Sequence, residues 1–467
     1  MASISIAGRR VGQEIPTGAG HLALFYTTDG GAELILSAYT DSTLLSGDLY
    51  IETYEGSAWV PRAFSTENTL RPDIFDTVLL DFGGRTPDAV AVLIDQFALA
   101  INDQNFDYEV FSQNSNSTIG TLLELVGVSV DAFLPNPPDV GFLGFIAKGS
   151  RLEFSYSING TAEDDILQGR SAAQQFFGNA GNDVLRGGRG DDVLNGGEGV
   201  DTAVFSGPQK GYTLTLSAAG TTLSDRSVGR DGSDALIDIE HLQFGTPSCP
   251  AMFDLGFYNG LTGLSETDFR SVIELYIAYF NRAPDAEGLY FWGVAFGNGY
   301  TLDQIARSFV DQDETRATYP EGTANRDFVD QVYGNVLGRA ADAGGGDFWV
   351  GLLDAGILQR DSFILRLLQG AKAEFKPELG QDFVDQQIAD QAFIETKTDI
   401  GAYFAVHKGM SDVADATDAM LLFDGTANGT NLAIAAIDGS YAQALDPAEG
   451  AFLMPWLGVI DDPFAIA

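Results

Sequence analysis

Aspartate residues recur at a fixed interval in the middle of this 467-residue chain, at a spacing that suits metal binding. From Gly160 the sequence divides without a phase slip into five nonapeptides: GTAEDDILQ, GRSAAQQFF, GNAGNDVLR, GGRGDDVLN and GGEGVDTAV. The third and fourth fit the template G-G-x-G-x-D-x-U-x, where U is a large apolar residue, whereas the second lacks the Asp and most glycines. Carboxylates presented regularly by glycine-rich turns favour a hard cation with oxygen ligands, such as Ca²⁺.

The nonapeptide spacing predicts a flattened parallel β-roll. In each repeat six residues would form a tight turn, helped by glycines that accept positive φ, and three would form a short strand. Two repeats would complete one turn of the roll, so that residues eighteen apart stack on the same edge. The residues at the eighth position would point inward: Leu167, Phe176, Leu185 and Leu194. Such a core is too thin to stand alone, so we expect bound cations to complete the fold.

The stacking decides where the aspartates meet. Asp165, Asp183 and Asp201 fall along one edge, which predicts one calcium site between Asp165 and Asp183 and another between Asp183 and Asp201. The opposite edge places Gln174 under Asp192. Because Gln174 is uncharged and its repeat lacks glycines, the sequence leaves open whether this edge binds calcium. The alternative, a disordered Gly/Asp-rich linker, is disfavoured by five in-phase repeats with mostly large apolar eighth positions.

These repeats resemble the RTX repeats of bacterial proteins exported by type I secretion. The resemblance implies that each ion also takes main-chain oxygens from the turns: Thr161, Glu163, Gly178 and Ala180 for the first site, and Asn179, Gly181, Gly196 and Glu198 for the second. It also implies an extracellular protein that passes through the type I secretion machinery without a cleaved signal peptide. Residues 201–245 look like the strand-rich cap that often follows such repeats, since a solenoid needs covered ends.

A second candidate chemistry involves His21 and Ser115. His21 opens an apolar strand, and Ser115 lies in an Asn/Ser cluster before a predicted helix, whose amides would stabilise an oxyanion. This arrangement resembles circularly permuted papain-like hydrolases, in which Cys is the nucleophile and His is the base, with Ser115 in the Cys position. Serine ionises far less readily, and no third polar residue can be assigned to orient His21. We therefore favour a binding module or a plain capped helix over an amide or ester hydrolase.

Residues 272–310 and 329–368 repeat each other at an offset of 57, with the pattern Y-x5-R-x2-D-x2-G-x2-F-W-x6-G. The pattern predicts a helix bearing Tyr and Arg, a loop whose Asp caps a second helix, and a terminal Gly that ends that helix. It resembles the DUF4214 family, which is found in large secreted and surface-layer proteins that also carry RTX repeats. The Arg/Asp pair could hold the loop or bind a carboxylate or sugar, and we favour the structural role.

These patterns predict a multidomain chain. Its parts would be an N-terminal α+β domain at 1–157, a parallel β-roll at 158–204, a β cap at 205–245, a mainly α-helical module at 262–375, and a C-terminal helix with a secretion tail at 376–467. The acidic tail without cysteines is typical of an uncleaved type I secretion signal.

The charge balance is strongly acidic, with 66 Asp and Glu against 25 Lys and Arg and a net charge of −41. A field of this sign repels nucleic acid and anionic lipid and suits multivalent cations, although solubility or salt tolerance alone would also explain it. Cys249 is the single cysteine, so an intramolecular disulfide is excluded. No run of 18 apolar residues predicts a membrane span, and residues 1–10 lack the apolar stretch of a signal peptide.

We therefore expect a secreted calcium-binding protein that acts as an extracellular binding or surface-associated protein, with a cell-surface or carbohydrate ligand as its partner. A secreted hydrolase that uses His21 and Ser115 is the second hypothesis, and a structural surface-layer component is the third. The ligand and the oligomeric state stay open at this level.

Overall fold

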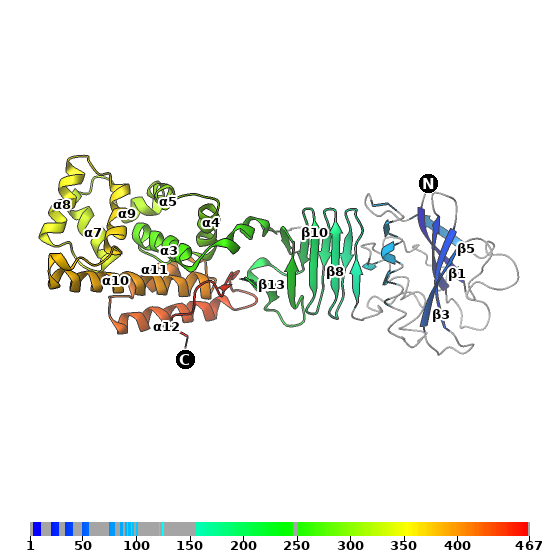
Figure 1. Ribbon diagram of the computed structural model, residues 1–467. Helices are drawn as coiled ribbons and strands as arrows, with labels where there is room; N and C mark the ends of the chain where they lie inside the picture. Colours follow the sequence, from blue (N-terminus) through cyan, green and yellow to red (C-terminus); the bar gives the residue numbers. More distant parts are fainter. Residues whose placement is uncertain are drawn as a thin grey trace. The chain divides into compact units, whose positions relative to one another are not determined.

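The computed structural model describes the backbone of five N-terminal strands, parts of residues 85–100 and 121–125, and residues 156–245 and 251–465. The chain divides into two compact units. Unit 1 contains Met1–Gly207 and Val228–Phe253, and unit 2 contains Pro208–Ser227 and Asp254–Ala467. Most labelled strands belong to unit 1 and the labelled helices belong to unit 2 (Figure 1).

The N-terminal part of unit 1 contains a five-stranded antiparallel sheet with the order β4-β3-β2-β1-β5. Its strands are β1 Ser3–Arg10, β2 Gly20–Thr27, β3 Glu33–Thr40, β4 Leu49–Glu55 and β5 Ile74–Leu79. His21 lies at the start of β2, opposite Arg9 of β1. Helical residues follow between 89 and 100 and between 121 and 125, so strands and helices both occur here, as the predicted α+β class requires.

The middle of unit 1 is a roll of two parallel sheets. One contains β6 Ser157–Asn159, β8 Gln175–Ala180, β10 Val193–Glu198 and β14 Ser233–Ile237. The other contains β7 Ile166–Gln168, β9 Val184–Arg186, β11 Thr202–Phe205, β15 His241–Phe244 and β16 Ala251–Asp254. Leu167 pairs with Leu185, and Leu185 pairs with Ala203, in steps of eighteen residues. The predicted β-roll and its stacking register are confirmed, and β8 and β10 run side by side in Figure 1.

A single ladder of apolar side chains fills the roll. The four predicted core residues, Leu167, Phe176, Leu185 and Leu194, are all fully buried. Glycines permit the turns to stack closely. The fourth residue of the fourth repeat, Gly190, has φ of 110°, and a Cβ there would lie 2.9 Å from the carbonyl carbon of Ala172 in the turn below. A side chain at this position would force adjacent turns apart.

The helical stretch between 89 and 100 covers the first rung of the roll. The side-chain amide of Gln96 donates to the carbonyl of Asn159 (2.8 Å) and accepts from its N–H (3.0 Å). Phe97 packs edge-on against Tyr156, with 5.2 Å between ring centroids. The open edge of β6 therefore gains hydrogen bonds and apolar cover from residues that precede the repeats, a role that the sequence did not indicate.

Residues 205–245, which we expected to cap the roll, are divided between the two units. Strands β14 and β15 continue the two parallel sheets of the roll, because β14 pairs with β10 and β15 pairs with β11. The hairpin formed by β12 (Tyr212–Ser217) and β13 (Gly220–Asp225) belongs to unit 2 instead. There β12 pairs with β17 (Trp456–Leu457), more than two hundred residues further along the chain. Strand pairing over such a distance leaves no local mark in the sequence.

Unit 2 is built mainly from helices. The first copy of the duplicated pattern contains α3 Glu266–Phe280, α4 Ala286–Gly297 and α5 Leu302–Val310, and the second contains α7 Asn325–Leu337, α8 Ala343–Asp354 and α9 Arg360–Ala371. The short α6 Asp313–Thr318 joins them. The chain continues through α10 Gln381–Ala402, a π-helical turn Tyr403–His407, α11 Val413–Leu421 and α12 Ala427–Ala444. The mainly α-helical class predicted for this region is confirmed.

The C-terminal segment that we expected to be a secretion tail is part of the folded unit 2. Leu453, Met454, Trp456 and Ile460 are buried, and the hydroxyl of Tyr290 donates to the carbonyl of Met454 (2.7 Å). Among the described helices, none combines the length and the apolar character needed to cross a membrane.

We predict that Leu185→Ala destabilises the calcium-loaded roll by about 2–5 kcal/mol, because it opens a cavity in a core one side chain wide. Val184→Ala is the matched control, since Val184 lies on the same strand and is partly exposed. Hydrogen exchange of peptides from β7, β9 and β11, measured in saturating calcium, should show faster exchange in the first variant than in the second. Equal exchange rates would contradict the single-ladder core.

Candidate calcium sites of the roll

Three of the four repeat aspartates use one carboxylate oxygen to hold a neighbouring turn, whereas Asp165 bonds Thr161 of its own turn. Oδ1 of Asp183 accepts the main-chain N–H of Asp165 (2.7 Å), and Oδ1 of Asp201 accepts that of Asp183 (2.7 Å). On the opposite edge, Oδ1 of Asp192 accepts the N–H of Gln174 (2.6 Å). The structure thus places Asp165, Asp183 and Asp201 on one edge and Asp192 on the other, as the eighteen-residue stacking predicted.

The other carboxylate oxygens are buried and make no hydrogen bond. They are Oδ1 of Asp165 and Oδ2 of Asp183, Asp192 and Asp201. All four residues are at most 2% exposed. A buried oxygen without a donor is costly, and the Oδ2 atoms of Asp183, Asp192 and Asp201, each facing the first glycine of its own repeat, indicate a common missing partner. A cation that the oxygens would coordinate is the partner that this chemistry fits.

Main-chain carbonyls point to the same places as these oxygens. A Cβ on Gly178 would overlap both Oδ2 of Asp183 and the carbonyl oxygen of Gly196 in the next turn. A Cβ on Gly196 would likewise overlap Oδ2 of Asp201 and the carbonyl oxygen of Asp238. In the described part of the chain, no three His, Cys, Asp or Glu side chains gather as a metal site. Any ion here must therefore combine few carboxylates with carbonyls, a ligand set that calcium accepts.

Burial and like charge raise the pKa values of the ladder. Desolvation raises the pKa of Asp183 to about 7, and the neighbouring charges of Asp201 and Asp165 add to the effect. Desolvation also raises the pKa of Asp192 to about 6 and that of Asp234 to about 8. Without a cation the folded roll therefore favours protonated carboxylates over ionised ones.

The main-chain ligands implied by the RTX resemblance lie in the turns beside these carboxylates. The carbonyl oxygen of Gly178 faces Gly160, next to Asp165. The carbonyl of Glu198 accepts the N–H of Gly181 (3.0 Å), so this oxygen also helps to hold two turns together.

Further members of the implied set contact their own or adjacent turns. The N–H and hydroxyl of Thr161 donate to Oδ2 of Asp165 (2.6 and 2.9 Å), and the side-chain amide of Asn179 donates to the carbonyl of Gly160 (2.7 Å). Ala180 is paired with Glu198 in the β8–β10 ladder.

Residues before and after the repeats also reach the ladder, and the sequence interpretation missed them. Arg85 interacts electrostatically with Asp165, and the carboxylate of Glu163 accepts the N–H and hydroxyl of Thr86 (3.0 Å each). Glu240 accepts the N–H of Asp201 (2.8 Å), and Asp234 accepts that of Asp192 (2.9 Å). Only the last had a local signal, because Asp234 lies in a further Gly/Asp-rich segment.

The candidate hydrolase pair stays a hypothesis. His21 lies on β2, as predicted, but its side chain and the whole of Ser115 lie outside the described residues.

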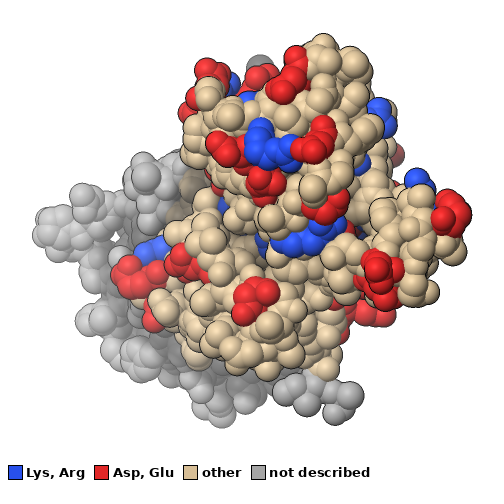
Figure 2. Space-filling model, turned by 90° about the vertical axis from the view of Figure 1, so that its left-hand side faces the viewer, with Lys and Arg blue, Asp and Glu red and all other residues tan. Residues whose placement is uncertain are grey.

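The Arg/Asp pairs of the helical module hold loops, as we favoured. Asp285 and Asp342 cap α4 and α8 by accepting the N–H of Gly288 (2.7 Å) and Gly345 (2.8 Å). The guanidinium of Arg282 bonds Asp285 (3.1 Å) and Glu314 and lies over the ring of Tyr276. Its counterpart Arg339 bonds both carboxylate oxygens of Asp390 and lies over the ring of Tyr333. On the face in Figure 2, basic side chains likewise lie next to acidic ones.

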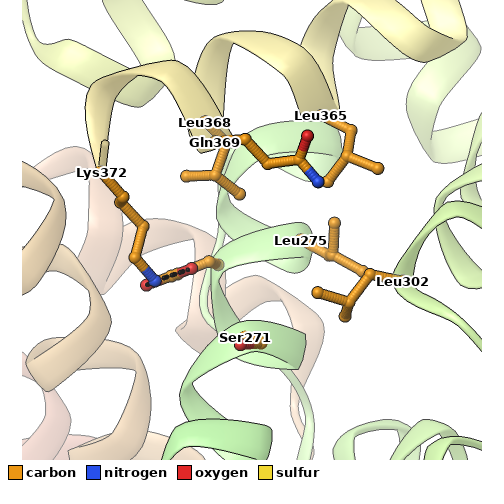
Figure 3. A pocket seen from close by; sticks show the side chains of 8 residues that line it. Ser271, Leu275, Leu302, Leu365, Leu368, Gln369 and Lys372 are labelled. Atoms are coloured by element: carbon orange, nitrogen blue, oxygen red, sulfur yellow. Dashed lines mark hydrogen bonds and ion pairs between the residues drawn. The ribbon is translucent and has the colours of Figure 1, made fainter. Parts of the chain in front are cut away.

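Unit 2 also contains a pocket of about 230 Å³ between α3, α5 and α9 (Figure 3). Its walls are Leu275, Leu302, Leu365, Leu368 and Gln369, with Ser271, Glu274 and Lys372 toward one end. Lys372 donates to both carboxylate oxygens of Glu274 (2.6 and 2.8 Å), and Ser271 donates to the carbonyl of Thr267 (2.8 Å). Lys372 and Glu274 neutralise each other and Ser271 bonds its own helix, so the pocket is mainly an apolar surface beside an ion pair.

Comparison with protein families agrees with this geometry. The model described as "RTX calcium-binding nonapeptide repeat (4 copies)" matches residues 172–203. The chain carries RTX repeats. Such repeats bind Ca²⁺ and are typical of proteins that type I systems secrete to the extracellular medium. The model "Domain of unknown function (DUF4214)" matches residues 306–379, which include the whole second copy of the duplicated pattern and the end of the first.

The comparisons with solved structures and with curated proteins show little similarity. The extracellular lipase LipA from Serratia marcescens is similar at 19% identity with a TM-score of 0.19, over 23% of this chain and 18% of the lipase. This RTX chain therefore spans less than a fifth of that lipase's length. A search of curated proteins gives no match.

We predict that calcium stabilises the roll more at about pH 7.5 than at about pH 5. The pKa values of Asp183, Asp192 and Asp234, about 7, 6 and 8, exceed the ordinary value of about 3.9. The metal-free fold therefore binds more protons than the unfolded chain, and its stability is present at low pH and lost as pH rises through 6–8. Thermal unfolding at both pH values, with calcium and with EDTA, tests this. A calcium-induced shift that does not depend on pH would contradict it.

We also predict that Asp183→Asn removes more calcium than Asp192→Asn. Asp183 lies between two turns on its edge, whereas Asp192 faces Gln174 on one side. Asn keeps an oxygen that can accept the neighbouring N–H, so the change tests charge rather than turn geometry. Calorimetric titration of the full chain should show a loss of about two ions against about one. Equal losses would mean that the two edges do not differ as described.

Proposed function

We propose that this RTX chain is a secreted protein whose roll folds when Ca²⁺ binds between its stacked turns, and that it acts outside the cell as a binding or surface-associated protein. One observation carries the proposal: the buried Oδ2 atoms of Asp183, Asp192 and Asp201, which occupy equivalent positions, make no hydrogen bond. A bound cation would satisfy all three in the same way.

The proposed ligands follow the two edges of the roll. On the first edge, one ion would bind between Asp165 and Asp183 and another between Asp183 and Asp201. Main-chain oxygens would complete the shells: those of Thr161, Glu163, Gly178 and Ala180 for the first ion, and those of Asn179, Gly181, Gly196 and Glu198 for the second. The close approach of the Gly178 and Gly196 carbonyls to the neighbouring turns supports this assignment.

Calcium-dependent folding would also suit export. The roll has a core one side chain wide and carboxylates whose pKa values are raised by burial, so the metal-free chain has little to hold it together at neutral pH. Extracellular calcium modules typically bind at about 10⁻⁴–10⁻³ M, which exceeds cytosolic calcium. The chain would therefore stay unfolded in the roll before type I secretion and fold after it.

The helical unit supports a role in binding. Phe291 and Phe348 occupy equivalent positions in the two copies of the module and are 47% and 58% exposed. Phe291 stacks one ring face on Phe257 (5.6 Å between centroids), and the exposed remainder of both Phe291 and Phe348 suits stacking against the apolar face of a sugar ring or a surface peptide. A cell-surface or carbohydrate ligand for this unit is accordingly part of the proposal.

We predict that chelation unfolds the roll and spares the helices. In excess EDTA, peptides from residues 156–204 should exchange hydrogen as an unfolded chain does, and millimolar calcium should restore protection. Peptides from α3 to α10 should stay protected in both conditions, because their buried charges are paired within the chain. Protection of the roll that does not change between EDTA and calcium would contradict calcium-dependent folding.

A further inference from the structure

Residues 229–237 form a sixth nonapeptide that is separated from the other five. Their sequence, GRDGSDALI, has Gly at the first and fourth positions, Asp at the sixth and Leu at the eighth. Leu236 pairs with Leu194, which is the eighth residue of the fourth repeat. Gly232 has φ of 88°, as the fourth position requires, and its turn lies directly on Gly190. The segment lies beyond the residues that the RTX family model matches.

After residues 208–227 the chain returns to the roll, and contacts of residues 206–207 with residues 230–231 hold the two ends of this segment together. Both carboxylate oxygens of Asp231 accept from Ser206, one from the N–H (2.7 Å) and one from the hydroxyl (2.6 Å). The guanidinium of Arg230 lies against Gly207, where any Cβ would overlap it. Between these points the chain makes the β12–β13 hairpin, which belongs to unit 2. The register of the roll is restored forty-two residues after Asp192 instead of eighteen.

The sixth repeat supplies a second carboxylate, that of Asp234, to the edge of the roll that carries Asp192. Asp234 is 1% exposed, and its Oδ1 accepts the N–H of Asp192 (2.9 Å). Asp192 is 2% exposed, and its Oδ2 has no hydrogen-bond partner and faces Gly187 at the start of its own turn. Asp183 stands in the same relation to Asp201 and Gly178 on the first edge.

We propose that Asp192 and Asp234 bind a further Ca²⁺ ion, with main-chain oxygens of the turns at 187–192 and 229–234. This inference rests on the proposed calcium-dependent folding and adds a site to it. It also gives an answer for the edge that the sequence left open: Gln174 lacks the charge for a site with Asp192, whereas Asp234 supplies it.

The position of this ion would give it a distinct effect. It would join two turns that are neighbours in space and are separated in the chain by the whole hairpin, so it would hold a long loop closed. Calcium at this site would therefore fix both ends of the hairpin segment, unlike the ions proposed between Asp165, Asp183 and Asp201 on the first edge.

Asp234→Asn in the full-length chain tests the site, with Asp418→Asn as the control. Asp418 is exposed on α11 of unit 2, so the control removes the same charge outside the roll. Calorimetric titration with calcium chloride should show about one ion fewer per chain for Asp234→Asn and the wild-type number for Asp418→Asn. Residues 229–237 should also exchange hydrogen faster in calcium in the first variant alone.

The outcomes separate this inference from the proposal on which it rests. If the wild-type chain binds no calcium, the proposed function itself fails. If the wild-type chain binds calcium and Asp183→Asn loses ions, but Asp234→Asn keeps the wild-type number and affinity, the sixth-repeat site alone is wrong. Hydrogen exchange of α3 to α10 reports whether each variant is otherwise folded, so a misfolded variant is not mistaken for a lost site.

Discussion

The rest of the roll depends on one unfavourable arrangement: carboxylates stacked in a buried column. Asp165, Asp183 and Asp201 lie on one edge, each 1% exposed or less, and each repels its neighbours. Main-chain N–H groups satisfy one oxygen of Asp183 and one of Asp201 but leave the net charge in place. Arg85 offsets part of the charge at Asp165, and an outside cation or bound protons must offset the rest, so the fold of this region depends on calcium and pH.

The helical unit also contains buried charges, but there the chain itself supplies their partners. Its buried charges have partners within the chain, as in Arg339 with Asp390 (2.6 Å) and Lys372 with Glu274 (2.6 Å). Lys397, which is 4% exposed, donates to Asn281 and to the carbonyl of Asn335, close to where two helices end. Because these charges are either paired with an opposite charge or hydrogen-bonded within the chain, we expect the helices to need no ion, so that one chain combines a calcium-dependent part with a calcium-independent part.

Continuity of the roll does not require continuity of the sequence. A solenoid needs each new rung to present an apolar residue inward and a polar cap at the edge, and Leu236 with Asp234 meets both needs after a long excursion. Residues that precede the repeats, such as Gln96, similarly satisfy the first rung. The roll is thus longer than its recognisable repeats, because backbone pairing tolerates departures from the template wherever the side chains still fit.

The sequence by itself determined the features that are periodic. The nine-residue interval fixed the stacking of Asp183 on Asp165 and the inward row of apolar residues, and the 57-residue offset fixed the duplicated helices with their Asp caps. Only the tertiary structure decided that Glu240 joins the first edge, that residues 208–227 belong to unit 2, and that β17 pairs with β12. The physical reason is the distance along the chain between the residues that interact. Local spacing dictates which residues of a repeat share a face, whereas pairing between distant segments depends on the shape and unsatisfied hydrogen bonds of surfaces that exist only once the chain has folded.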